Sequence, residues 1–119
     1  MYYLYLIQSP KGRAGFGIAK NPQSRNRDYV AHCGDIVNFP YLYGGTIAHI
    51  KKIENVIKEQ YIDNIWHIED RPLEWLNNNI SVDQLKDYVD TLIEERHYRV
   101  KLIAKNYNFT QDVFNDLLT

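Results

Sequence analysis

A short strand that runs directly into a capped helix, over residues 14–29, constrains the fold of this chain more than any other stretch. Asn21 is a favoured N-cap residue, and Pro22 follows it at the first helical position, where its missing N–H leaves no hydrogen bond unmade. The helix therefore has a defined start. Three polar side chains then share one face of it, at i, i+4 and i+7: Arg25, Tyr29 and His32. That face is either simply solvated or functional, and periodicity alone leaves both interpretations open.

Length, composition and charge limit the classes of protein to consider. With 119 residues and 45% apolar residues, the chain is expected to form one globular domain. Its net charge of −1 argues against a protein that coats nucleic acid without specificity. Residues 1–33 hold five Lys and Arg against Asp28, a balance of +4, which leaves −5 for the remainder. A basic N-terminal part fits a local phosphate-facing surface, and it also fits chance.

The single cysteine, Cys33, excludes an intrachain disulfide and an all-cysteine zinc site. The four histidines show no ligand spacing with it, so a zinc site is not expected. No apolar run is as long as a membrane span, and the N-terminus lacks the order of a signal peptide. The sequence predicts a soluble, intracellular, cytoplasmic protein.

The first twenty residues predict a hairpin. Residues 2–8 favour a strand, 9–12 a turn, and 14–20 a return strand. Gly15 and Gly17 are unfavourable inside a plain strand. Either something must approach the backbone there, or the glycines mark a bulge or a crowded packing site.

The rest of the chain predicts a small α+β domain, with a three-stranded, largely antiparallel sheet flanked by helices and a helical C-terminal extension. Residues 64–80 combine apolar anchors with loop-forming Arg71-Pro72 and a run of asparagines, and no element is assigned to them. The other expected elements are a strand over 39–43 ended by two glycines, a helix from Thr46 to about Asp63, a helix opened by the capping box Ser81–Gln84 and reaching about His97, a strand or more helix over 99–105, and a last helix from Thr110 to Leu118.

Glu54 lies in the apolar stripe of the helix that starts at Thr46, between Ile50 and Ile57. A carboxylate on an inward stripe is unfavourable unless a cation, a metal ion or hydrogen-bond donors meet it, so Glu54 is a candidate site residue. The alternative is that Ile53 and Val56 widen the apolar face, which would leave Glu54 at its margin and in reach of water.

Taken together, these residues resemble the GIY-YIG nuclease family, most closely its compact branch often found in phages. The resemblance covers residues 1–78, which would form the nuclease core, with 79–119 as a helical extension packed on the same domain. Residues 71–76 are similar to a segment that follows the glutamate helix in the phage branch. The residues that carry the resemblance are the triplets Tyr3-Leu4-Tyr5 and Gly15-Phe16-Gly17, then Arg25 with Tyr29 on one helix, and Glu54 on the next.

The chain departs from the family pattern at two places. Gly15 stands where the family has the tyrosine that opens the second triplet, and the first triplet lacks its glycine. The missing phenol is replaced by the remaining one, or by another tyrosine, or catalysis is impaired. The other tyrosines considered for that role are Tyr3, Tyr41 and Tyr43.

The resemblance implies metal-dependent hydrolysis of phosphodiester bonds in DNA. Glu54 would hold Mg²⁺ or Mn²⁺, and Arg25 would bind the scissile phosphate. Tyr29 or Tyr5 would accept a proton from the attacking water, with a pKa lowered by the metal, Arg25 or Lys20. Four further residues are expected to contact the substrate: Gly17, Lys20, Arg27 and His32.

Two other functions remain open at this stage. One is a catalytically impaired module with the same fold that binds DNA or a protein. The other is an unrelated α+β interaction protein whose helix from Ser81 forms a dimer face. One metal site per chain cuts one strand at a time, so under the nuclease interpretation double-strand cleavage would need either a homodimer or repeated nicking.

Overall fold

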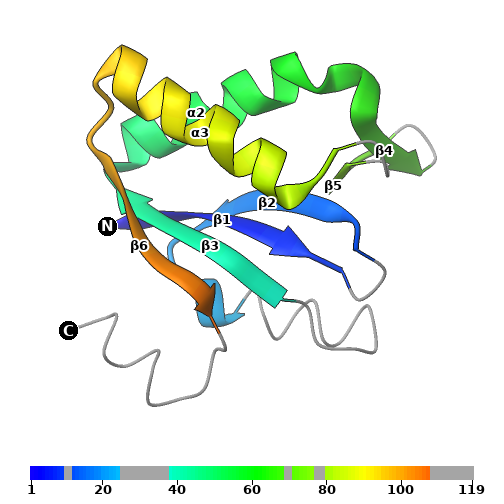
Figure 1. Ribbon diagram of the computed structural model, residues 1–119, viewed down its shortest axis with the longest axis horizontal. Helices are drawn as coiled ribbons and strands as arrows, with labels where there is room; N and C mark the ends of the chain where they lie inside the picture. Colours follow the sequence, from blue (N-terminus) through cyan, green and yellow to red (C-terminus); the bar gives the residue numbers. More distant parts are fainter. Residues whose placement is uncertain (10–11, 25–37, 69–70, 77–79, 108–119) are drawn as a thin grey trace.

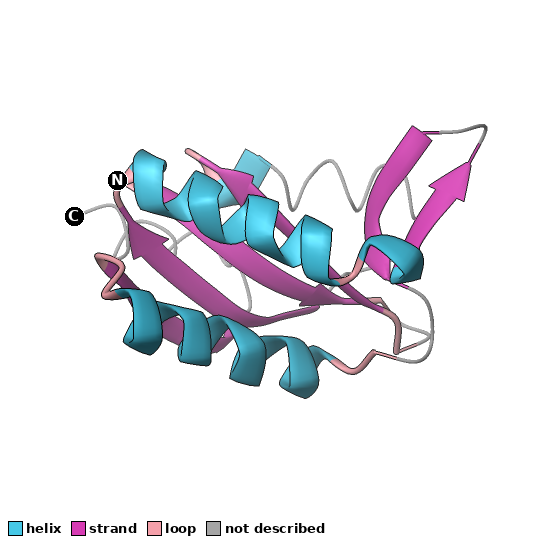
Figure 2. Ribbon diagram, turned by 90° about the horizontal axis from the view of Figure 1, so that it is seen from above, coloured by secondary structure: helices cyan, strands magenta, loops and turns pink. Residues whose placement is uncertain are grey.

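The computed structural model describes residues 1–9, 12–24, 38–68, 71–76 and 80–107. The strands are β1 (Tyr2–Gln8), β2 (Ala14–Ala19), β3 (Asn38–Gly45), β4 (Ile65–Ile68), β5 (Arg71–Leu76) and β6 (Val100–Tyr107). They form one antiparallel sheet in the order β4-β5-β2-β1-β3-β6. Two helices, α2 (Ile47–Gln60) and α3 (Val82–Arg96), cover one face of this sheet, as Figures 1 and 2 show. The α+β class is therefore confirmed.

The predicted N-terminal hairpin is present. β1 and β2 pair antiparallel with Tyr5 opposite Gly17, and the Gly12 N–H donates to the Ser9 carbonyl at 2.8 Å to close the turn. β3 pairs with the other edge of β1. The three strands expected from the sequence thus form the centre of the sheet.

The prediction of only three strands is wrong, because β4, β5 and β6 extend the sheet on both sides. Arg71-Pro72 suggested a loop, since proline interrupts a strand ladder. Among the residues that the structure describes, however, β5 pairs with β2 at one position, Gly15 opposite Trp75. Pro72 lies three residues before Trp75 and is opposite His67 of β4, the strand at the edge of the sheet.

The sequence allowed a strand or more helix over residues 99–105, and the structure has a strand there, β6. It pairs with β3 from Gly45–Val100 to Phe39–Tyr107. Residues 79–119 are therefore not a purely helical extension, since a strand of this region belongs to the same sheet as the N-terminal hairpin. The predicted helix from Thr110 to Leu118 lies outside the described residues.

Both long helices begin where their capping residues predict. The Thr46 hydroxyl accepts a hydrogen bond from the His49 N–H at 3.5 Å, and the Ser81 hydroxyl accepts one from the Gln84 N–H at 3.0 Å. α2 ends at Gln60, earlier than predicted, and a short 3₁₀ helix, η1 (Ile62–Asn64), follows it. Within the described chain, neither helix is long and apolar enough to cross a membrane.

The side chains of β1 alternate between two apolar clusters, one on each face of the sheet. Leu4 and Leu6 point towards the helices and pack with the buried isoleucines of α2 and the leucines of α3. The opposite face carries a second cluster, formed by Tyr3, Tyr5, Ile7, Phe39 and Leu42. Because both faces of β1 are buried, the hairpin is the centre of the packed core.

Candidate functional site

Gly17 and Tyr5, two of the predicted site residues, are packed against each other. A Cβ atom at Gly17 would lie 2.2 Å from the Tyr5 hydroxyl and 2.5 Å from Cζ, so only glycine leaves room for the ring. Tyr5 is fully buried, and its ring centroid lies 5.6 Å from that of Phe39. Of the two explanations for Gly17, crowded packing is therefore correct, and the space expected for substrate is filled by the Tyr5 ring.

The helix predicted to follow β2 starts as expected. Residues 22–24 are helical, and the Ser24 N–H donates to the Asn21 side-chain oxygen at 3.3 Å. Asn21 is thus the N-cap. The site residues predicted further along this stretch lie outside the described residues: Arg25, Arg27, Tyr29 and His32.

Glu54 lies at the margin of the buried stripe of α2. Ile50, Ile53 and Ile57 are fully buried, whereas the Glu54 side chain keeps 18% of its surface exposed. Its Oε1 lies 3.5 Å from Nζ of Lys58, one helical turn further on. The alternative in which Ile53 widens the apolar face is therefore correct, and the carboxylate reaches water.

The two flanks of α2 face different parts of the molecule. On one flank, His49 Nδ1 accepts a hydrogen bond from the Arg99 N–H at 2.8 Å, and its ring lies 5.2 Å from that of Tyr98. Lys51 and Lys58 lie roughly opposite His49 around the helix, at about 100° per residue. Lys51 lines a pocket together with Ile18 and Ala19 of β2, so this flank, which also carries Glu54, faces the end of β2. Figure 2 shows α2 and α3 side by side over the sheet.

A pocket of about 440 Å³ lies at the end of β2 on this side. It collects side chains from the ends of β1 and β2, from the start of the helix at Asn21 and from α2: Tyr2, Ile18, Ala19, Lys20, Asn21, Ser24 and Lys51. Lys20, a predicted substrate contact, thus shares a pocket with Lys51, and both are exposed. The two ammonium groups make this pocket suited to an anion.

Sequence reasoning missed Lys51, although a signal for it exists. Lys51 lies three residues before Glu54, and residues at i and i+3 are neighbours on a helix surface. Because Glu54 is a candidate site residue, Lys51, one turn before it on the same flank of the helix, is a candidate as well. Its proximity to β2, by contrast, depends on how α2 crosses the sheet.

Tyr5 and Glu54 are not brought together. Tyr5 points to the face of the sheet that α2 and α3 leave uncovered, whereas Glu54 belongs to α2 itself. The sheet therefore separates the phenol from the carboxylate. A burial this complete also removes Tyr5 from contact with solvent.

The other tyrosines considered as replacements for the missing phenol have different contacts. The Tyr41 hydroxyl donates to Asp83 at 2.6 Å, which raises the pKa of Tyr41 to about 12. Burial raises the pKa of Tyr43, and its hydrogen bond to Asp90 at 2.7 Å raises it further. A raised pKa keeps a phenol protonated, so these two side chains are poorly suited to act as bases. They attach α3 to β3 instead.

The carboxylate of Glu54 is an oxygen ligand of the kind that Mg²⁺ takes. Among the residues that the structure describes, no three His, Cys, Asp or Glu side chains gather in one place. Magnesium binds through one or two carboxylates together with water and substrate phosphates, so a single accessible carboxylate is compatible with it.

Comparison of the chain with protein-family models, with curated proteins and with solved structures finds no match in any of the three. The motifs of the chain and the geometry around Glu54 and Lys20 are therefore what a functional assignment depends on.

Proposed function

We propose that this protein is a metal-dependent endonuclease of the GIY-YIG type that hydrolyses phosphodiester bonds in DNA. The observation that supports this most is the position of Glu54. Its accessible carboxylate lies on the flank of α2 whose Lys51 shares a pocket with Ser24. Arg25, the proposed phosphate ligand, directly follows Ser24 in the sequence.

In this proposal each residue has a separate role. Glu54 would hold the metal ion, and the chemistry that such an ion would supply is neutralisation of charge on the phosphate and on the leaving oxygen. The planar guanidinium of Arg25 binds the scissile phosphate and stabilises the charge that develops in the transition state. Lys20 and Lys51 hold a neighbouring phosphate. Tyr29 accepts the proton of the attacking water, since Tyr5 is buried.

The test is cleavage of supercoiled plasmid in the presence of Mg²⁺. The wild-type protein should cut, and Glu54→Gln and Arg25→Ala should each lower the rate by about 100-fold, the effect typical of losing one charge-stabilising group. Glu59→Gln is the matched control, because Glu59 is an exposed acid on the same helix and the charge change is identical. This control should cut at the wild-type rate.

A calorimetric titration with Mn²⁺ tests the metal separately from the reaction. Binding should be lost in Glu54→Gln and kept in Glu59→Gln. If the two variants bind Mn²⁺ and cut DNA equally well, Glu54 is not the metal ligand and the proposal is wrong.

A second function, a DNA- or protein-binding module without catalysis, is favoured by one observation. Tyr5 is fully buried, and Gly15 occupies the position of the family's other tyrosine, so neither triplet presents a phenol to solvent. The same plasmid assay separates the two functions. Plasmid that is retarded in a gel but stays intact with Mg²⁺ and Mn²⁺ identifies a binding module.

A further inference from the structure

Four strands end at the same side of the molecule. Because the sheet is antiparallel, β2 and β3 finish where β1 and β6 begin. The register places Tyr3 opposite Ala19, Tyr2 opposite Gly45 and Gly45 opposite Val100. β2 and β6 are the outer strands of this group. Lys20 follows β2 and Arg99 precedes β6, so these two residues lie at opposite ends of the row formed by the four strand ends.

Two pockets adjoin along this edge, beneath the first half of α2. The first is the pocket that contains Lys20 and Lys51. The second, of about 370 Å³, is lined by Met1, Tyr2, Gly45, Thr46, Ile47 and Arg99. Tyr2 lines both pockets, so together they form a furrow across the ends of four strands. At the usual spacing of about 4.8 Å between strands, the furrow is about 14 Å long.

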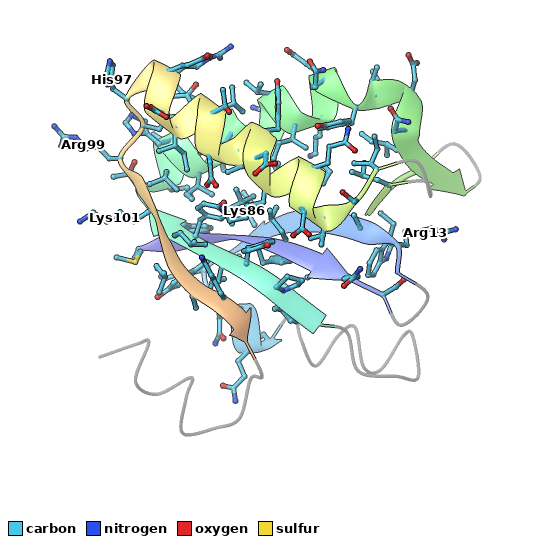
Figure 3. All side chains as sticks on the ribbon, viewed as in Figure 1. Arg13, Lys86, His97, Arg99 and Lys101 are labelled. Atoms are coloured by element: carbon cyan, nitrogen blue, oxygen red, sulfur yellow. The ribbon has the colours of Figure 1, made fainter. Side chains whose placement is uncertain are left out.

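Both ends of this furrow are positively charged. Lys20 and Lys51 line one end, Arg99 lines the other, and Lys101 lies two residues after Arg99, near the start of β6. All four side chains are exposed, and Figure 3 shows Arg99 and Lys101 pointing outwards from the start of β6. In the described part of the chain, no Asp or Glu lines either pocket. The furrow is therefore complementary to a chain of regularly spaced negative charges.

We propose that Lys20, Lys51, Arg99 and Lys101 form a track for the sugar–phosphate backbone of the DNA substrate. This inference rests on the proposed function and extends it, because β6 lies outside the part of the chain that resembles the nuclease family. Each strand of duplex DNA has one phosphate per about 3.4 Å of helix axis, so about 14 Å of axis corresponds to about four nucleotides of one strand. The apolar surface of Tyr2 and Ile47 between the cationic ends suits sugar rings between two contacted phosphates.

The test variant is the double substitution Arg99→Ala/Lys101→Ala. It should preserve the fold, because the contact of Arg99 with His49 is made by its backbone N–H. Binding of a fluorescently labelled DNA duplex is measured in EDTA, which prevents cleavage, over a series of salt concentrations. The slope of log affinity against log salt should fall by about 0.9 for each phosphate contact that is lost. Affinity should fall equally for unrelated DNA sequences.

Lys105→Ala is the matched control. Lys105 is an exposed lysine of the same strand, four residues from Lys101 and therefore about 13 Å further along β6. This variant should keep the wild-type slope. If the double variant also keeps that slope, or if the wild-type protein binds no DNA, the track is overturned.

The outcome for the track is distinguishable from the outcome for the endonuclease. If the wild-type protein cuts plasmid but the double variant keeps the wild-type salt dependence, the track is wrong and the endonuclease stands. If Arg99 and Lys101 control binding but no metal supports cleavage, the endonuclease is wrong and the track stands. Poly-glutamate is the competitor that tests for an acidic protein partner. If it binds more tightly than DNA at equal salt, the nucleic-acid assignment is overturned.

Discussion

Gly17 lies against the Tyr5 ring across the hairpin, so close that a Cβ atom would overlap the ring. This packing explains why the residue is glycine, whereas the sequence alone also allowed a role in substrate access. Tyr5 is buried between β2 and Phe39, so its ring cannot move away from an added methyl group. The contact joins the two triplets on which the resemblance to the nuclease family rests, because Tyr5 belongs to one and Gly17 to the other. It makes the hairpin register specific, because a shift of one residue would place a side chain under the ring.

We expect Gly17→Ala to lower the free energy of unfolding by about 1–3 kcal/mol, the usual range for overpacking a core. Urea denaturation followed by tryptophan fluorescence measures this. Gly44→Ala is the control, because its Cβ would also lie 2.2 Å from a neighbour, but that neighbour is the end of the partly exposed Ile103 side chain. Gly44→Ala should therefore have the smaller effect, and equal losses would contradict the rigidity of Tyr5.

Tyr41 and Tyr43 predict a loss of stability at alkaline pH. A tyrosine whose pKa is raised on folding stabilises the native state below its ordinary pKa of about 10, and this stabilisation is lost as the pH rises through the folded value. For Tyr41 the folded pKa is about 12. Urea denaturation at increasing pH should show the wild-type protein losing stability above pH about 10 more steeply than Tyr41→Phe/Tyr43→Phe. Parallel curves would contradict the hydrogen bonds to Asp83 and Asp90.

At the scale of the element, α3 is held by its cap and by its contact with β3. The Ser81 hydroxyl satisfies the Gln84 N–H at 3.0 Å, and the carboxylates of Asp83 and Asp90 accept hydrogen bonds from the tyrosines of β3. Lys86 also pairs with Asp90 on the helix surface. The helix is thus fixed to the sheet by side chains on a single flank.

We expect Ser81→Ala to destabilise the protein by about 1 kcal/mol, the typical value for removing an N-cap. Thr46→Ala at the start of α2 should have a smaller effect, because its hydrogen bond to the His49 N–H is longer, at 3.5 Å. Thermal unfolding followed by circular dichroism compares the two variants. A larger effect at Thr46 would contradict this ranking.

α2 has a structural flank and a second flank that carries the proposed metal ligand. His49 attaches the helix to the chain at Arg99, the residue before β6. The opposite flank presents Lys51, Glu54 and Lys58 to solvent and to the end of β2. The same helix therefore carries the carboxylate proposed to bind the metal on one flank and contacts the start of β6 with the other.

At the scale of the whole molecule, the proposed site contains one metal-binding carboxylate per chain. We expect nicked circles to accumulate before linear plasmid as the reaction proceeds, because a single site cuts one strand at a time. Agarose gel electrophoresis of a time course separates the two products. Linear DNA that appears first, at all protein concentrations, would instead indicate two sites acting together in a homodimer.

The sequence by itself determined the features that depend on a few neighbouring residues. The caps at Asn21, Thr46 and Ser81 and the N-terminal hairpin are where the pattern predicts them. A cap or a tight turn is stabilised by hydrogen bonds within about four residues, so its signal is complete in the local sequence. The margin position of Glu54 was also among the alternatives that helical periodicity allowed.

Only the tertiary structure decided the features that need a partner distant in the chain. β5 and β6 are strands because β2 and β3 offer them edges to pair with, and Gly17 is glycine because Tyr5 lies across from it. The meeting of Lys51 with Lys20, and of Arg99 with the end of β3, follows from the antiparallel order of the sheet. Such contacts join residues far apart in sequence, and no local pattern contains them.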